Sequence, residues 1–168
     1  RFYQSRDEQG VDETLLHAFW IQVITCARCG HRFDAHPRFR LAWDAPADRQ
    51  WVACRLCSRI LEGPCTATRL RCTCGTSTAV DSGQSTYGTT CCPHCGHSER
   101  LIDVAVRTGT PPAFRLFAVE TLPPGSERRW PTPCRRIRTA SAFDQACFAA
   151  ARAALHRLSA DNPHLIPA

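Results

Sequence analysis

Eight cysteines arranged as four close pairs constrain this fold more than any other feature of the chain. The pairs are Cys26 with Cys29, Cys54 with Cys57, Cys72 with Cys74, and Cys92 with Cys95, and three of the four are followed directly by glycine. Such a turn offers two thiolates from one short loop, and a following glycine permits the positive φ that directs backbone amides toward the sulfurs. In a chain of 168 residues, clustered thiols predict small metal-stabilised units rather than a broad hydrophobic core.

The rest of the composition favours metal over disulfides. The first 13 residues include several charged side chains, so a signal peptide is not expected. No run of about 18 apolar residues occurs anywhere, so a membrane span is not expected either. We therefore expect a reducing, cytoplasmic setting with no membrane partner, where clustered cysteines indicate metal ligands. The absence of methionine further suggests a piece of a longer chain.

Two structural zinc ions account for the eight thiols. Zinc binds four ligands tetrahedrally, and two such turns, each on its own hairpin, close one site as a zinc ribbon. Pairing neighbours in chain order predicts one site from Cys26, Cys29, Cys54 and Cys57 and a second from Cys72, Cys74, Cys92 and Cys95, although interleaved ligation is an alternative. Iron accepts the same ligands as zinc. Because protein sulfur would fill all four positions, neither ion is expected to bind substrate.

The predicted fold class is small, metal-stabilised and mostly β: two tandem zinc ribbons of short antiparallel hairpins, followed by a strand and a C-terminal α-helix. Asp12 is a candidate cap for a short helix over "ETLLHAF". Strands are expected over residues 19–25 and 113–122, and hairpins over 51–62, 67–80 and 89–106. The expected segments are 1–19 (lead-in with the short helix), 20–63 (first ribbon), 64–122 (second ribbon and following strand), 123–140 (Pro/Arg-rich linker) and 141–168 (helix and tail).

The last helix carries its own start signal. Ser141 and Asp144 are spaced close to a capping box. The apolar residues that follow share one face of the predicted helix, which indicates packing against another surface; they are Phe143, Cys147, Ala150, Ala154, Leu155 and Leu158.

Four cysteines and three histidines lie outside the predicted tetrads. Cys91 could replace its neighbour Cys92, and Cys65 is the main rival ligand for the second site, whereas Cys134 and Cys147 read as buried or idle thiols. With four cysteines already present at each site, the nearby His31, His94 and His97 are expected to support the ligands or face solvent rather than bind metal.

Arginine supplies all 21 basic residues, but overall charge is a weak guide to partners. The formal charge of +6 falls to about +2 once two ions are each held by four thiolates. The local pattern is more informative, because residues 126–140 hold five arginines and one glutamate. No Gly-rich phosphate loop, Gly-x-Ser-x-Gly motif or obvious carboxylate pair is present, so the sequence predicts no enzyme activity for this segment.

Two stretches, "CGHRFDAHPRF" (29–39) and "PPAFRLFAVETLPP" (111–124), together with the four cysteine pairs, carry a resemblance to a known family. Over residues 15–168 the chain resembles the zinc-ribbon segment inserted in large prokaryotic adenine-specific DNA methyltransferases. The closing "NPHLIPA" resembles the point where that family's chain re-enters its methylase portion. The family's Asp/Asn-Pro-Pro-Tyr/Phe motif and Gly-rich turn are absent, and "TPPAF" (110–114) lacks the residue that precedes the prolines. The resemblance therefore implies no catalytic residue here, and places S-adenosylmethionine only in the parent chain.

Two functions follow from the resemblance. In the first, the segment contacts DNA beside a flipped adenine, and the tryptophans Trp43, Trp51 and Trp130 could stack on a base. In the second, the ribbons form a scaffold that docks onto the methylase body or a partner subunit. Arginines near the cysteine pairs and in the linker would bind phosphates or guanine edges; they are Arg28, Arg32, Arg38, Arg55, Arg71, Arg128, Arg129, Arg135, Arg136 and Arg138.

Overall fold

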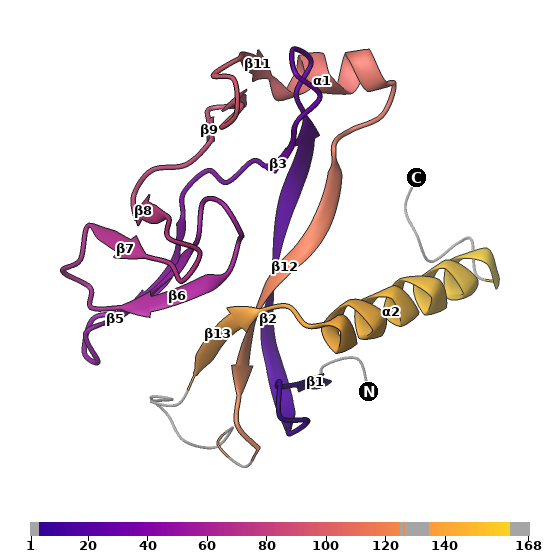
Figure 1. Ribbon diagram of the computed structural model, residues 1–168. Coiled ribbons are helices and arrows are strands. Elements are labelled where there is room, and N and C mark those ends of the chain that lie inside the picture. Colours follow the sequence, from indigo (N-terminus) through magenta and orange to yellow (C-terminus); the bar gives the residue numbers. More distant parts are fainter. Residues whose placement is uncertain (1–3, 125, 127–134, 162–168) are drawn as a thin grey trace. The chain divides into compact units, whose positions relative to one another are not determined.

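The computed structural model describes residues 4–124, 126 and 135–161 (Figure 1). These residues divide into two compact units. The cysteine unit comprises Phe19–Ala118 with Ile137–Thr139, and the terminal unit comprises Arg1–Ala18, Val119–Arg136 and Ala140–Ala168. Strands predominate in the described residues, as expected. None of the described helices has the length and apolar character needed to cross a membrane.

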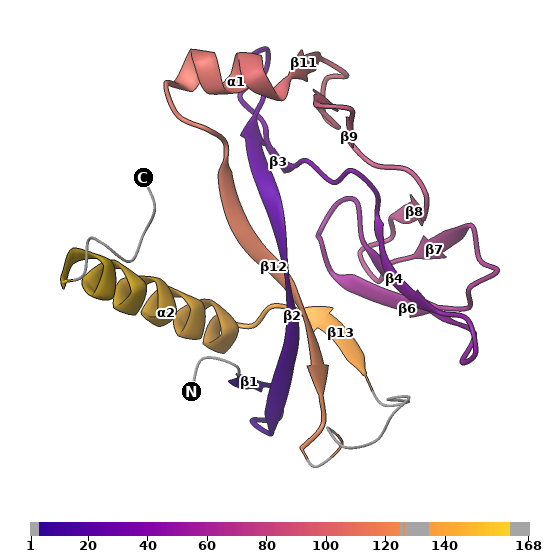
Figure 2. The same ribbon diagram turned by 180° about the vertical axis from the view of Figure 1, so that it is seen from behind.

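The largest sheet has the order β1-β2-β12-β13, with β3 paired to β2 off this path. Strands β2 and β12 lie side by side in both views (Figures 1 and 2). The strands of this sheet are β1 (Gln4–Arg6), β2 (Asp12–Thr25), β3 (Arg32–Asp34), β12 (Ala113–Leu122) and β13 (Arg136–Thr139). The predicted strand over 113–122 is confirmed with its bounds.

Three small sheets complete the cysteine unit, and the described strands in them pair antiparallel. The predicted hairpins over 51–62 and 67–80 are confirmed as β5 with β6 and β7 with β8. The strands are β4 (Arg40–Asp44), β5 (Arg49–Ala53) and β6 (Ile60–Gly63) in one sheet, β7 (Arg69–Arg71) and β8 (Ser77–Ala79) in another, and β9 (Ser85–Thr86), β10 (Thr89–Cys91) and β11 (Ser98–Arg100) in the third.

The core of the cysteine unit is divided into small clusters, as expected for a chain organised around cysteine pairs. One cluster surrounds Trp51 and Phe117, a second holds Ile24 and Phe33 together with buried cysteines, and a third centres on Phe39. Each cluster draws on strands from distant parts of the sequence. The cores therefore form only after the hairpins have come together.

Two predicted elements are wrong. The stretch "ETLLHAF" belongs to strand β2 rather than to a helix, because residues 12–14 pair with β1 and the strand then continues to Thr25; sheet pairing outweighs the local helix propensity. The hairpin expected over 89–106 ends at β11, and helix α1 (Leu101–Thr108) follows. Helix α1 ends at Gly109, which has a left-handed backbone conformation. The buried Val104 of α1 packs, beside Leu101, into the cluster that holds Ile24 and Phe33.

The terminal unit contains helix α2 (Ala142–Asp161). The expected capping box is present, since the backbone N–H of Ser141 donates to Asp144 Oδ2 at 2.7 Å and the N–H of Asp144 donates to Ser141 Oγ at 3.3 Å. Asp144 also accepts a hydrogen bond from Ser5 of β1. Beyond this start, Phe143, Cys147 and Ala154 of the expected packing face are half-buried, while Leu155 and Leu158 are 59% and 61% exposed in the described part of the chain.

Candidate metal centres

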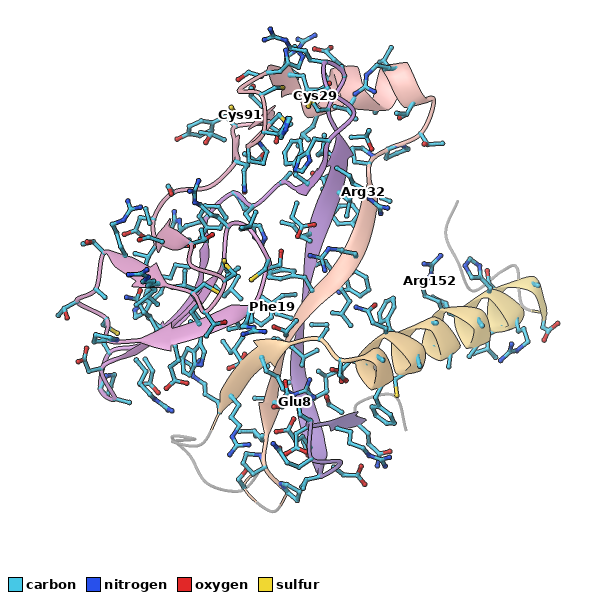
Figure 3. The ribbon with its side chains drawn as sticks, viewed as in Figure 1. Glu8, Phe19, Cys29, Arg32, Cys91 and Arg152 are labelled. Atoms are coloured by element: carbon cyan, nitrogen blue, oxygen red, sulfur yellow. The ribbon has the colours of Figure 1, made fainter. Side chains whose placement is uncertain are left out.

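Four cysteines from the two ends of the cysteine unit form one candidate centre, called the outer centre. Cys26 and Cys29 lie in the turn between β2 and β3, and Cys92 and Cys95 lie in the turn between β10 and β11. Their Sγ atoms all lie within 4.8 Å of one another. The Cys26–Cys95 and Cys29–Cys92 sulfurs are 3.6 and 3.7 Å apart. Figure 3 labels Cys29 in the first of these turns and Cys91 at the end of β10, next to the second.

The remaining four paired cysteines form the inner centre. Cys54 and Cys57 lie in the turn between β5 and β6, and Cys72 and Cys74 lie in the turn between β7 and β8. The Cys54–Cys74 and Cys57–Cys72 sulfur distances are both 3.6 Å. In each centre one cysteine of every pair is buried while its partner is more exposed. Both centres are thus partly sheltered but reachable from solvent.

The spacing of the sulfurs fits a tetrahedral ion rather than a disulfide. A metal–sulfur distance of about 2.3 Å in a tetrahedral site places sulfurs about 3.8 Å apart. The four closest cross-pair distances fall at 3.6 to 3.7 Å. A disulfide would need about 2.05 Å. All eight cysteines are free thiols in the described structure, so the two tetrads could hold two metal ions.

One backbone pattern builds all four turns. In the first, the N–H of Cys26 donates to His31 O at 3.0 Å and the N–H of Gly30 donates to Cys26 O at 3.0 Å. The turns that begin at Cys54, Cys72 and Cys92 repeat both bonds, with a one-residue contraction in the Cys-x-Cys turn at Cys72. Each turn closes through hydrogen bonds within about six residues, which is why the cysteine spacing in the sequence was sufficient to identify it.

The second turn departs from the others because Ser58 occupies the position that glycine holds elsewhere. Ser58 has a φ of 56°, in the left-handed region where a side chain is disfavoured. Its hydroxyl donates to Asp34 Oδ2 at 2.7 Å, and the same carboxylate is paired with Arg115. The strained serine therefore ties the inner centre's first turn to the end of β3.

Ionisation of the thiols is strongly uneven without a cation. Burial opposes ionisation of Cys26, yet the backbone amides of Cys29 and Arg28 outweigh it and lower its pKa to about 7. Hydrogen bonds from Thr76, first from its side chain and then from its backbone, lower the pKa of Cys74 to about 6.

Their neighbours shift the opposite way. The backbone amide of His31 is the largest influence on Cys29 and favours its thiolate, but burial and the adjacent thiols outweigh it and raise the pKa to about 12. Burial and the adjacent thiols likewise raise the pKa of Cys57 to about 12. Four crowded thiolates therefore need a positive charge among them, which a divalent ion supplies.

The expected grouping of the pairs in chain order is wrong. The outer centre joins the first and fourth pairs, and the inner centre joins the second and third. The two tetrads are therefore nested along the chain, with both inner pairs lying between the two outer pairs. Strand pairing explains this grouping. The first turn joins β2 to β3 in the large sheet, whereas the second turn follows β5, which pairs with β4 in a separate sheet. The first two cysteine turns therefore belong to different sheets.

The other cysteines and histidines lie outside both tetrads. The Sγ of Cys65, the expected rival ligand, lies 3.1 Å from Arg49 O, and the Sγ of Cys91 lies 3.6 Å from Gly96 O. Cys147 is half-buried on α2, while Cys134 falls outside the described residues. His31 stacks on His94 with ring centroids 5.3 Å apart. Neither they nor His97 belong to a group of candidate ligands in the described residues.

The arginines named as candidate DNA contacts are placed in different ways. Five surface arginines of the cysteine unit are exposed, and so is Arg136, which lies 3.9 Å from Glu13. The other linker arginines that are described, Arg135 and Arg138, are half-buried, and Arg135 pairs with Glu120. Arg128, Arg129 and Trp130 lie outside the described residues. The five exposed arginines of the cysteine unit are Arg28, Arg32, Arg38, Arg55 and Arg71.

The tryptophans differ in the same way. Trp51 is 1% exposed and belongs to the core, so the expectation that it stacks on a base is wrong. Trp43 is 57% exposed and lies beside Arg40, whose guanidinium is 6.0 Å from the ring centroid.

Comparisons with protein-family models, with curated proteins and with solved structures find no match to this chain. The class that the fold and the site define is a mostly β chain with two cysteine tetrads able to hold metal.

Proposed function

We propose that this chain is the zinc-binding, DNA-contacting module of a prokaryotic adenine-specific DNA methyltransferase. The observation that carries the proposal is the pair of nested cysteine tetrads with exposed arginines on their turns. Catalysis and S-adenosylmethionine binding belong to other parts of the parent chain in this proposal. The resemblance of the sequence to the cysteine-rich insert of such methyltransferases connects the module to DNA.

Zinc is the proposed metal at both centres. It is the usual ion for four-thiolate structural sites and needs no redox chemistry. The ions would be structural, because all four coordination positions at each centre are supplied by cysteine. Their role is to hold the turns in place, since the separate hydrophobic clusters are small.

The metal-clamped turns present the arginines that would contact DNA. Arg28 lies inside the first cysteine turn and Arg55 inside the second, while Arg71 directly precedes Cys72. A turn that is already ordered loses less conformational entropy when its side chains bind, which favours association. Guanidinium groups on such turns suit phosphate oxygens, and those that reach a groove suit guanine edges.

The test is a DNA-binding titration of zinc-loaded protein at 50 and 200 mM salt. Contacts between arginines and phosphates release counterions, so affinity for duplex DNA should fall steeply as salt rises. Metal analysis of the same sample should find two zinc ions per chain. No binding at micromolar protein and low salt would reject the DNA-contact proposal.

A second candidate function is a docking scaffold for the methylase body or a partner subunit. The exposed part of the expected packing face of α2 favours it, because Leu155 and Leu158 are more than half exposed in the described residues. In that case removal of these side chains would impair assembly while DNA affinity stayed unchanged.

A further inference from the structure

A groove lies between the turns of the two metal centres, within the cysteine unit. Its volume is about 610 Å³, and side chains from turns of both centres line it. His31 and His94 come from the outer centre's two turns, and Arg55 and Leu56 come from the inner centre's first turn. Both metal centres therefore contribute to a single hollow that neither ribbon could form alone.

The charges in the groove favour an anion. Asp34 is engaged by Arg115, with Arg115 Nε 2.9 Å from Asp34 Oδ1, and by the Ser58 hydroxyl. Its negative charge is thereby compensated. Arg32 and Arg55 also line the groove and are exposed, and neither forms an ion pair with another described residue. Figure 3 labels Arg32, the first residue of β3, which pairs with Thr25 at the end of β2.

The groove also has flat and apolar surfaces that phosphate alone would not need. The His31 ring stacks on His94 with an interplanar angle of 24° and lies nearly parallel to Phe33 at 7°. Leu56, which follows Arg55 in the same turn, is 71% exposed and adds apolar surface to the groove. Gln84 also lines this hollow.

We infer that this groove binds one unpaired nucleotide of a single-stranded segment of nucleic acid. Arg32 and Arg55 bind its phosphate, and its base packs against the apolar and imidazole surface of Leu56 and His31. The inference rests on the proposed function and adds to it which nucleic-acid state is bound and where.

The dimensions of the groove favour a nucleotide over a duplex. A volume of about 610 Å³ lies in the range of pockets that enclose a small ligand. Bases in an intact duplex are stacked on one another, so their faces cannot reach a recessed surface. An unpaired base has a free face, and stacking on side chains tolerates any base.

The experiment compares zinc-loaded protein binding to a fluorescein-labelled single-stranded 12-mer and to its duplex at 100 mM salt. The wild type should bind the single strand at least five-fold more tightly. Arg55→Gln and Arg32→Gln should each weaken single-strand binding by roughly ten-fold and lower its salt slope by about 0.7. Leu56→Ala, which removes stacking surface, should weaken it by roughly five-fold or more.

Arg59→Gln is the matched control. Arg59 is an exposed arginine at the end of the cysteine turn that carries Arg55, but it does not line the groove and is not among the proposed DNA contacts. It should weaken binding by less than three-fold. A content of two zinc ions per chain in each variant establishes that both centres are intact. Arg32 lies in β3 rather than in a turn, so its variant remains informative if the Arg55 variant loses metal.

The two levels of the proposal fail differently. If neither nucleic acid binds the wild type, the DNA-contact function and the groove inference are both wrong. If duplex binds as tightly as single strand, or if Arg59→Gln weakens binding as much as Arg55→Gln and Arg32→Gln, then the groove inference is wrong and DNA contact remains.

Discussion

The nested grouping of the cysteine pairs makes a prediction that zinc counting can decide. The double variant Cys29→Ser with Cys95→Ser removes one ligand from each outer turn, and both belong to the same tetrad. It should therefore lose one zinc ion and keep the other. Grouping in chain order would place these two cysteines in different sites, and both ions would be lost.

A matched double variant reverses the expectation. Cys29→Ser with Cys57→Ser damages one ligand in each centre of the nested arrangement, so it should retain no zinc. Under grouping in chain order it would retain one ion. The two variants have the same number of altered cysteines, and they share Cys29→Ser, so they differ only in which centre the second substitution reaches.

The structure also sets the relative cost of losing each centre. The outer centre links residues 63 positions apart, Cys29 and Cys92, whereas the inner centre links Cys57 and Cys72 across 15 positions. Treating each as a crosslink on the unfolded chain gives about 4.3 kcal/mol for the outer loop and about 3.0 kcal/mol for the inner loop. Loss of the outer centre should therefore cost about 1 kcal/mol more, equivalent to about 2–4 °C in Tm for a chain of this size.

The assay is metal analysis of purified variants, supported by thermal melts followed by circular dichroism. One zinc ion in Cys29→Ser with Cys95→Ser, and none in the matched variant, is the expected outcome. Cys57→Ser with Cys74→Ser, which removes the inner centre alone, should melt above the outer-centre variant. Zinc contents in the reverse order would refute the nested arrangement on which the groove also depends.

Three further predictions follow from the same structure. Removal of metal by a strong chelator should abolish the β-sheet signal of the cysteine unit and its cooperative melt, since folding and metal binding are coupled; an unchanged spectrum and melting curve would contradict a metal-stabilised fold. Gly83→Ala should lower the free energy of unfolding by about 1–3 kcal/mol, because a Cβ there would lie 2.2 Å from His36 O. In the control Gly88→Ala the new Cβ meets no atom within 4 Å, so the loss should be only about 1 kcal/mol, owing to the positive φ. Equal losses in urea unfolding would argue against the close approach of the backbone at Gly83. Burial lowers the pKa of His36 from 6.5 to about 4. Between these values the unfolded chain binds a proton at this residue and the folded chain does not, so the protein should be about 2 kcal/mol less stable at pH 5 than at pH 7. His36→Phe in excess zinc should flatten that part of the stability–pH profile, and an unchanged slope would count against the assignment.

Several features were predictable because they depend on short stretches of chain. The cysteine turns close through hydrogen bonds such as Cys26 N–H to His31 O, and the capping box needs only Ser141 and Asp144. The strand over 113–122 alternates and follows two prolines. Helix α1 had a readable signal that was missed: Leu101 and Val104 at helical spacing, ended by Gly109.

Other features depended on pairing partners far away in the sequence. The segment after Asp12 has helix-forming residues, but its edge is occupied by β1 and the strand is extended to Thr25. The buried Trp51 reads in sequence like any exposed aromatic near a cysteine turn, and only the packing of Phe117 and Ile137 around it makes it core. The groove likewise needs turns separated by tens of residues to meet.

The sequence by itself determined which residues form the candidate metal centres, because a Cys-x-x-Cys turn forms through its own backbone whatever surrounds it. The tertiary structure decided which turns share an ion. Any two turns offer an ion the same four sulfurs, so coordination chemistry cannot choose between partners. The choice falls to the strands that carry the turns: β3 returns to β2, β5 pairs with β4 and β6, and the fourth turn on β10 and β11 meets the first.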